Sequence, residues 1–189
     1  MTRRIAKVDL DAVDAFAEAA HRGQCRNTGD DSAPEIPYIV HPRAVRDILA
    51  HEHPDPAAGE SWILAVALLH DVLEDCDVHH DTLADEFGEN VSAAVRALSK
   101  QIKVVPAARK TDAQYWQVLR QAPLAIRRVK AADRVDNLRS CVRWSREKLA
   151  RKYLDETPRE VLPLVADDPF LHGVLTALLD ELQARYPQT

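Results

Sequence analysis

The feature that most limits how this chain can fold is an apolar run that ends abruptly in polar residues. Eight apolar residues, 62–69, lead directly into His70 and Asp71, and Glu74 and Asp75 follow one helical turn later. A segment that is apolar on nearly every side is typical of a helix buried in the middle of a bundle. The 14 residues from 62 to 75 are too few to span a bilayer, which needs about 20. We therefore expect a central helix whose apolar half packs in the core and whose polar half presents chemistry.

The rest of the chain has the composition of an ordinary folded domain. Of its 189 residues, 46% are hydrophobic and 29% are charged, as in globular proteins generally. A chain of this length can bury one sizeable core, so we expect a single domain over 1–189. Glycines number only five and β-branched runs are few, which favours helices over a sheet.

Charge, cysteine content and the first residues exclude several other classes of protein. The net charge of −5 argues against a general nucleic-acid binder. The three cysteines, Cys25, Cys76 and Cys141, form no CxxC pair, so neither a disulfide framework nor a cysteine zinc site is expected. The opening MTRRIAKVDLDAV lacks the apolar region of a secretory signal. We therefore expect a cytoplasmic protein that engages neither a membrane nor nucleic acid.

Apolar spacing, caps and breakers predict an all-α bundle of about nine or ten helices and no strand. Pro42 should open the second helix, since proline suits the first helical position. The segment Cys25 to Pro37 should be a loop, and loops of this length are often functional. Asp81, Asn90 and Asp168 are expected to cap later helices. The expected helices cover 8–22, 42–50, 61–75, 82–87, 91–98, 111–121, 123–144, 145–155 and 169–186.

The polar end of the central helix could bind a metal ion together with residues from other helices. His70 and Asp71 would point about 100° apart on a helix, and an ion between them would be reached by both. Further ligands must come from elsewhere, and His41 and Asp133 are candidates. Asn137 lies one turn after Asp133 and should share its face. Two histidines and two aspartates form a mixed site that suits Mn, Fe, Co, Ni or Zn.

Each of these residues also has an ordinary structural interpretation. A His-Asp dipeptide is common, His41 could cap its helix, and Asp133 could pair with Arg134 or Arg139 in a surface network. Glu74 and Asp75 could form a solvated helix end, although acidic residues there oppose the helix dipole. The histidines in polar stretches are expected to face solvent: His51, His53, His79 and His80.

The order of several motifs identifies the chain more specifically. The segments AHRGQCR, YIVHP, ALLHDVLED and KAADRVDNLRS resemble those of the HD-domain hydrolases of the RelA/SpoT type. The likeness is closest to the single-domain small alarmone hydrolases, which resemble the metazoan SpoT homologue. The motifs run from about Ala15 to Ser140, and no synthetase domain could fit in the remaining residues. The resemblance implies an HD-domain helical bundle that hydrolyses the 3′-pyrophosphate of ppGpp or pppGpp, giving GDP or GTP and pyrophosphate, usually with manganese.

The resemblance also implies roles for individual residues. The implied metal ligands are His41, His70, Asp71 and Asp133. The implied pair that positions the attacking water and takes its proton is Glu74 and Asp75. Arg26 matches an arginine that packs on the guanine base, which suits its planar cation, and Asn137 matches a nucleotide-contacting asparagine. Cations that could balance the substrate charge, or simply lie on a solvated face, are Lys100, Lys103, Arg109, Lys148, Arg151 and Lys152.

The chain departs from the family pattern on the substrate side. Asn27 stands where the family commonly has a basic residue, and the loop 28–36 is longer than the usual link. Asp136 stands where the family often has His or Tyr, and a carboxylate beside a polyphosphate is unfavourable unless it faces away. Two alternatives therefore stay open. One is an HD-domain nucleotidase or phosphatase that acts on ppApp or on the 2′-phosphate of NADPH, and the other is a module that binds an alarmone without cleaving it.

Overall fold

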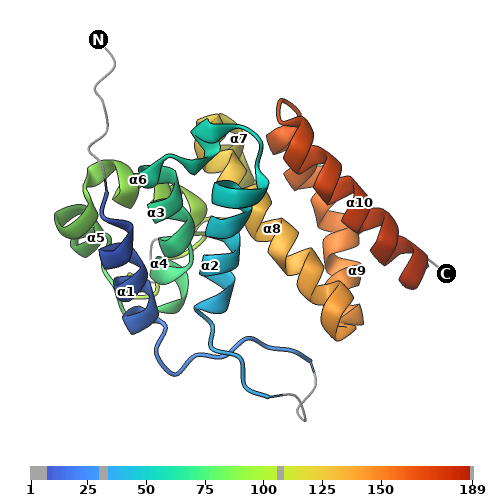
Figure 1. The fold of residues 1–189 in the computed structure, drawn as a ribbon, viewed down its shortest axis with the longest axis horizontal. Helices are drawn as coiled ribbons and strands as arrows, with labels where there is room; N and C mark the ends of the chain where they lie inside the picture. Colours follow the sequence, from blue (N-terminus) through green and yellow to red (C-terminus); the bar gives the residue numbers. More distant parts are fainter. Residues whose placement is uncertain (1–7, 30–33, 106–108, 188–189) are drawn as a thin grey trace.

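The computed structural model describes residues 8–29, 34–105 and 109–187, which form an all-α bundle without a strand in those ranges (Figure 1). This confirms the fold class expected from the sequence. Short 3₁₀ or π-helical turns occupy 48–52, 56–59 and 157–165. The α-helices are α1 (Leu10–Ala20), α2 (Val40–Asp47), α3 (Ser61–Leu69), α4 (Val72–Asp75), α5 (His80–Phe87), α6 (Glu89–Leu98), α7 (Asp112–Gln121), α8 (Leu124–Trp144), α9 (Glu147–Glu156) and α10 (Pro169–Arg185).

Helix α3 lies inside the bundle because it is apolar on every side. Its residues 63–69 are all buried, and it packs against α1, α2, α6 and α8 (Figure 1). Leu68 and Leu69 are completely inaccessible to solvent. Burying a leucine side chain contributes about 1.5–3 kcal/mol, so this helix is held firmly in place. Its carboxyl end is therefore a rigid support for the polar residues that follow.

The chain does not continue as one helix through the polar residues, which corrects the expectation of a helix over 61–75. Helix α3 ends at Leu69, and α4 begins at Val72. Asp71 lies between them with φ −98° and ψ −8°, in the sparsely populated bridge region. Its carbonyl oxygen accepts the N–H groups of Glu74 (3.1 Å) and Asp75 (2.9 Å), which starts a new turn. His70 and Asp71 therefore lie in the turn between the two helices.

The loop before α2 is closed at its base by backbone pairing. Cys25 and Pro37 form an isolated bridge, and the N–H of Arg26 donates to the carbonyl of Ile36 at 2.7 Å. Residues 30–33 of the expected loop lie outside the described residues. Helix α2 begins at Val40, so the expected start at 42 is two residues late. A proline in the first turn sacrifices no helical hydrogen bond, because the first N–H groups of a helix have no partner within it.

The helix caps agree with the sequence at one position and differ at two. Asp168 caps α10 as expected, through an oxygen that accepts a first-turn N–H. His79 caps α5 in place of Asp81, because its Nδ1 accepts the Asp81 N–H at 3.3 Å. Asn90 caps no helix, since α6 starts directly after Gly88. Gly88 has φ +91°, a conformation that glycine adopts without strain, and the chain turns there from α5 into α6.

His53 is buried, which corrects the expectation that it faces solvent. Its side chain is 2% exposed, and its Nε2 lies 2.9 Å from Asp168 Oδ2. Arg128 Nε donates to the same oxygen at 2.6 Å. A buried carboxylate must be paired, and these two partners satisfy Asp168 where α8 meets α10. His53 therefore helps to hold the segment after the turn 48–52 against the start of α10.

Two further observations concern the cysteines and the possibility of a membrane-spanning helix. The three cysteines are free, with Cys25 exposed and Cys76 and Cys141 buried. Within the described ranges, no helix is both long enough and apolar enough to cross a membrane.

Candidate metal centre and active site

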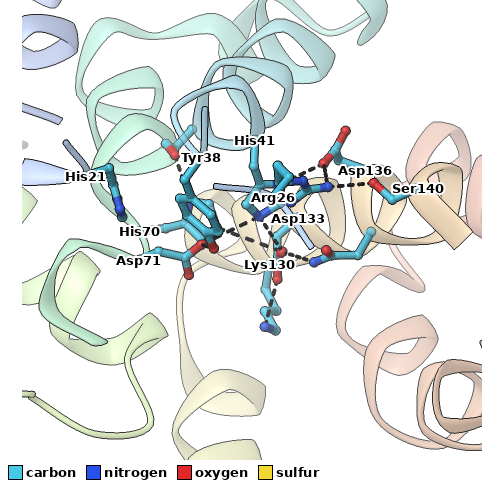
Figure 2. A network of polar contacts seen from close by, with 12 residues as sticks. His21, Arg26, Tyr38, His41, His70, Asp71, Lys130, Asp133, Asp136 and Ser140 are labelled. Carbon is cyan, nitrogen blue, oxygen red and sulfur yellow. Dashed lines mark hydrogen bonds and ion pairs between the residues drawn. The ribbon is translucent and has the colours of Figure 1, made fainter. Parts of the chain in front are cut away.

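Three of the four expected metal ligands converge in the core of the bundle. His41 comes from α2, His70 follows α3, and Asp133 lies on α8. One ligand atom of each lies within 4.8 Å of the others, and all three side chains are buried (Figure 2). His41 Nε2 is 3.2 Å from Asp133 Oδ1, and His70 Nε2 is 3.8 Å from the same oxygen. The packing of α2 and α3 against α8 brings them together.

Asp71, the fourth expected ligand, borders this group. Its Oδ2 lies 3.1 Å from His70 Nε2 and 3.5 Å from His41 Nε2. The same oxygen accepts the hydroxyl hydrogen of Tyr38 at 2.7 Å. The break between α3 and α4 allows Asp71 to turn toward the imidazole of the residue before it. The arrangement thus offers two nitrogens and carboxylate oxygens to one point in space.

The hydrogen bonding of His70 shows that this group fits a cation. Its Nδ1 lies 2.8 Å from the carbonyl of Ala67, so Nδ1 carries the hydrogen and Nε2 presents its lone pair. Nε2 is buried and makes no regular hydrogen bond with any described residue, yet it faces two carboxylates. Lone pairs gathered in a buried site need a proton or a metal ion between them. Mixed imidazole and carboxylate donors suit a divalent transition metal.

The charges within the group perturb each other strongly. Burial alone would lower the pKa of His70, but the negative charges of Asp71 and Asp133 raise it well above its ordinary value. Burial alone would raise the pKa of Asp133, but the charge of Lys130 and contacts with both histidines lower it well below the usual range. A bound metal would take the place of the protons that these imidazoles otherwise attract.

Asp133 is held in place by neighbours on its own helix. Lys130 Nζ donates to Oδ2 at 2.8 Å, and Asn137 Nδ2 donates to Oδ1 at 2.5 Å. The expected shared face of Asp133 and Asn137 is confirmed by this contact. Arg134 pairs instead with Glu156, so the alternative of an Asp133–Arg134 surface pair is wrong. Lys130 was not anticipated, although its i, i+3 spacing from Asp133 is a signal that the sequence contains.

The two acidic residues after Asp71 point in different directions. Glu74 lines a cavity of about 210 Å³. Its carboxylate accepts the backbone N–H of Lys100, and burial raises its pKa. Asp75 does not line this cavity, and burial together with the charge of Asp71 raises its pKa as well. The cavity is also lined by four cationic residues, by further carboxylates and by polar and aromatic side chains: Lys100, Lys130, Arg134, Lys152, Asp112, Asp133, Glu156, Asn137, Tyr115, Trp116 and Tyr153.

Arg26 lies against α8 and is part of a hydrogen-bond network. Its Nη2 donates to Asp136 Oδ2 at 2.7 Å and to Ser140 Oγ at 2.5 Å, and its side chain is only 7% exposed (Figure 2). Asp136 faces Arg26 and His41 and does not line the cavity that contains Glu74. The carboxylate of Asp136 is therefore directed away from the space where an anionic group would enter.

Two aromatic side chains near the site were also missed by sequence reasoning. Tyr38 orients Asp71, and burial raises the pKa of its hydroxyl, which therefore stays protonated as a donor. His21 packs on the Tyr38 ring with 4.8 Å between ring centroids, and its Nδ1 lies 2.8 Å from Gln24 Oε1. Gln24 Nε2 in turn donates to the Asp75 carbonyl at 2.9 Å. The sequence did contain a signal for them, because His21 and Gln24 lie within the motif AHRGQCR and Tyr38 lies within YIVHP.

Comparisons with known proteins agree with this geometry. The family model described as HD domain matches residues 14–159. The chain is 32% identical over 177 residues to guanosine-3′,5′-bis(diphosphate) 3′-pyrophosphohydrolase MESH1 of Mus musculus, covering 91% of this chain and 93% of that protein. It is 37% identical to the 3′-pyrophosphohydrolase of Vibrio cholerae, over 90% of this chain and 23% of that enzyme. The chain thus spans less than a quarter of this bacterial relative.

A solved structure is similar to this chain over nearly its whole length. It belongs to a metazoan orthologue of SpoT, described as a protein that hydrolyses ppGpp and plays a role in starvation responses. The two chains superpose with a TM-score of 0.69 at 25% sequence identity, over 98% of each. The likeness therefore extends over the whole bundle and includes helices beyond the segment matched by the family model.

Proposed function

Because the chain belongs to the HD-domain family, we propose that it is a metal-dependent phosphohydrolase that cleaves the 3′-pyrophosphate of ppGpp and pppGpp. The observation that supports this most directly is the buried group of His41, His70 and Asp133, which adjoins a cavity that contains Glu74. The similarity to a relative of nearly equal length, named for this activity, supports the choice of substrate. We propose residues 1–189 as one hydrolase domain.

The four ligands expected from the sequence would hold the metal, and manganese suits their mixed donors. When bound, the ion supplies positive charge that polarises the phosphate ester and acidifies water. Glu74 is placed to take the proton of the attacking water, and its raised pKa suits a general base. Asp75 would help to orient that water. The water oxygen bonds to the phosphorus that the ribose 3′-oxygen carries, and the bond between this phosphorus and the 3′-oxygen breaks. The 3′-oxygen takes up the proton that Glu74 removed from the water, and pyrophosphate leaves.

The lysines that line the cavity can contact a charged phosphate group if it replaces their present carboxylate partners. Lys100 is paired with Asp112, and Lys130 with Asp133. Lys100 and Lys152 line the cavity together with Lys130. A second hollow of about 550 Å³ shares Lys152 and is lined by Asn27, Lys148 and neighbouring residues. The smaller cavity would take the 3′-pyrophosphate, and the nucleoside would extend toward the larger one. In this proposal Arg26 packs on the guanine base and Asn137 contacts the nucleotide.

The proposal is tested by a phosphate-release panel on the purified protein with and without Mn²⁺. The substrates are ppGpp, pppGpp, ppApp and NADPH, and the products are identified by chromatography. We expect GDP and pyrophosphate from ppGpp only when metal is present, and no turnover by the Asp71→Ala variant. Full ppGpp hydrolysis by that variant would overturn the metal assignment. Turnover of ppApp or NADPH alone would favour a different nucleotidase, and ppGpp binding without turnover would favour a sensor.

The manganese preference is tested separately by comparing turnover with Mn²⁺, Co²⁺, Ni²⁺ and Zn²⁺ after chelation. We expect the highest rate with Mn²⁺. The cytoplasmic location and the absence of a nucleic-acid partner, both expected from the sequence, stay predictions.

A further inference from the structure

One carboxylate oxygen of Asp136 connects the metal ligands to the loop after α1. Asp136 Oδ2 lies 2.6 Å from His41 Nδ1 and 2.7 Å from Arg26 Nη2 (Figure 2). Arg26 is further held by Ser140 Oγ at 2.5 Å, one turn along α8. The residues that meet here are 95 and 110 positions apart in the chain. This contact therefore exists only in the folded protein.

We propose that Asp136 is a positioning residue that orients His41 for the metal and fixes Arg26 beside it. Asp136 contacts neither of the reacting groups proposed above, and it would act only through these two partners. The inference rests on the proposed metal site but does not depend on which nucleotide is the substrate.

The geometry at His41 supports the first part of the proposal. The ring is 2% exposed, so water does not substitute for the Asp136 carboxylate as the acceptor of the Nδ1 hydrogen. An imidazole that donates from Nδ1 directs the lone pair of Nε2 outward. That lone pair faces Asp133 Oδ1 at 3.2 Å and Asp71 Oδ2 at 3.5 Å, which is the position where a metal would bind. A carboxylate partner also makes a histidine a stronger ligand and fixes the orientation of its ring.

The geometry at Arg26 supports the second part. Asp136 is 17% exposed, and without a cation it would add negative charge close to the carboxylates of Asp71 and Asp133. The Arg26 guanidinium offsets this charge, so the His41 ring receives a carboxylate partner at little electrostatic cost. A charge-assisted hydrogen bond of this kind is about twice as strong as a neutral one, which holds Arg26 in one place.

The test measures metal binding without any nucleotide. The variant Asp136→Asn keeps the side-chain shape but replaces the charged acceptor with a neutral amide. We expect its Mn²⁺ dissociation constant, measured by calorimetry or by electron paramagnetic resonance, to rise about 10- to 100-fold. The matched control is Glu52→Gln. Glu52 forms a two-bond ion pair with Arg139, which lies on α8 like Asp136, and Glu52 contacts no metal ligand. We expect the control to bind Mn²⁺ like the wild type. Equal Mn²⁺ affinity of Asp136→Asn and wild type would overturn the proposal.

Two further measurements separate positioning from a general loss of structure. Nitrogen-15 NMR of wild-type protein should show His41 protonated at Nδ1, and a proton on Nε2 instead would overturn the proposal even if the variant fails to fold. Excess Mn²⁺ should restore most of the kcat of Asp136→Asn, while its KM for ppGpp stays raised because Arg26 is loosened. A kcat that excess metal does not restore would contradict action through His41. If no nucleotide is hydrolysed but the Mn²⁺ affinity falls as expected, the proposed function fails and this inference stands.

Discussion

Glutamine in place of Glu74 should change activity and stability in opposite directions. The Glu74 carboxylate accepts the backbone N–H of Lys100, and the amide oxygen of glutamine can accept the same hydrogen bond. The substitution therefore preserves shape and packing but removes the group that takes the proton. General acid–base catalysis contributes about 10²- to 10⁴-fold, so kcat should fall by that factor. This corresponds to about 3–5 kcal/mol of activation free energy.

The stability change follows from the pKa of Glu74. Burial raises this pKa in the folded state above the ordinary glutamate value of 4.5. The folded protein then binds the proton more tightly than the unfolded chain does. The stabilisation from the protonated form is present below pH 4.5 and is lost as the pH rises through the folded pKa. Desolvation disfavours the ionised form of the Glu74 carboxylate, whereas the glutamine side chain is neutral at every pH. We expect Glu74→Gln to be more stable at pH 7 by about 1 kcal/mol.

Two measurements on each protein test this reasoning. Pyrophosphate release from ppGpp gives kcat, and urea unfolding of metal-free protein gives the free energy of unfolding at pH 7 and pH 4. The stability advantage of the variant should disappear at the lower pH. The reasoning is refuted if the variant keeps most of its activity and is less stable at pH 7. Loss of activity in Asp75→Asn alone would instead assign the general base to Asp75.

Four further predictions concern the metal ligands and the groups around them. Tyr38→Phe removes the hydroxyl that donates to Asp71 at 2.7 Å and should weaken Mn²⁺ binding about tenfold in calorimetry, while unchanged affinity would contradict an orienting role. Lys130→Met removes the lysine cation that pairs with Oδ2 of the largely buried Asp133 carboxylate and should destabilise the metal-free protein by about 3 kcal/mol in urea, with a negligible change arguing against the ion pair. Chelation should abolish turnover, and Mn²⁺ at 100 times its dissociation constant should add about 2.7 kcal/mol to stability. Because the pKa of His70 is raised, protons compete with the metal, so Mn²⁺ affinity should fall as the pH is lowered, and an affinity independent of pH would contradict this competition.

Local patterns in the sequence were sufficient to place most of the helices and to name candidate metal ligands. The apolar run 62–69 predicts a buried helix because no exposed face could accommodate it, and α3 is buried as expected. The i, i+4 spacing of Asp133 and Asn137 predicts a shared face, which their hydrogen bond confirms. The ordered motifs also predicted that His41 and His70 belong to one site, and their side chains lie close to Asp133 in the core.

The tertiary structure alone decided how these residues face one another. The break between α3 and α4 lies within a segment whose local pattern favours one continuous helix. The hydrogen bond from Tyr38, a residue of a different segment, holds Asp71 beside the imidazoles of His41 and His70. Asp136 looked unfavourable in the sequence because its partners, His41 and Arg26, are distant in the chain. His53 looked exposed for the same reason, since its partner Asp168 lies 115 residues away. Helical periodicity is local, so the sequence indicates it directly, whereas the pairing of buried charges depends on which helices pack together and is decided only when the bundle closes.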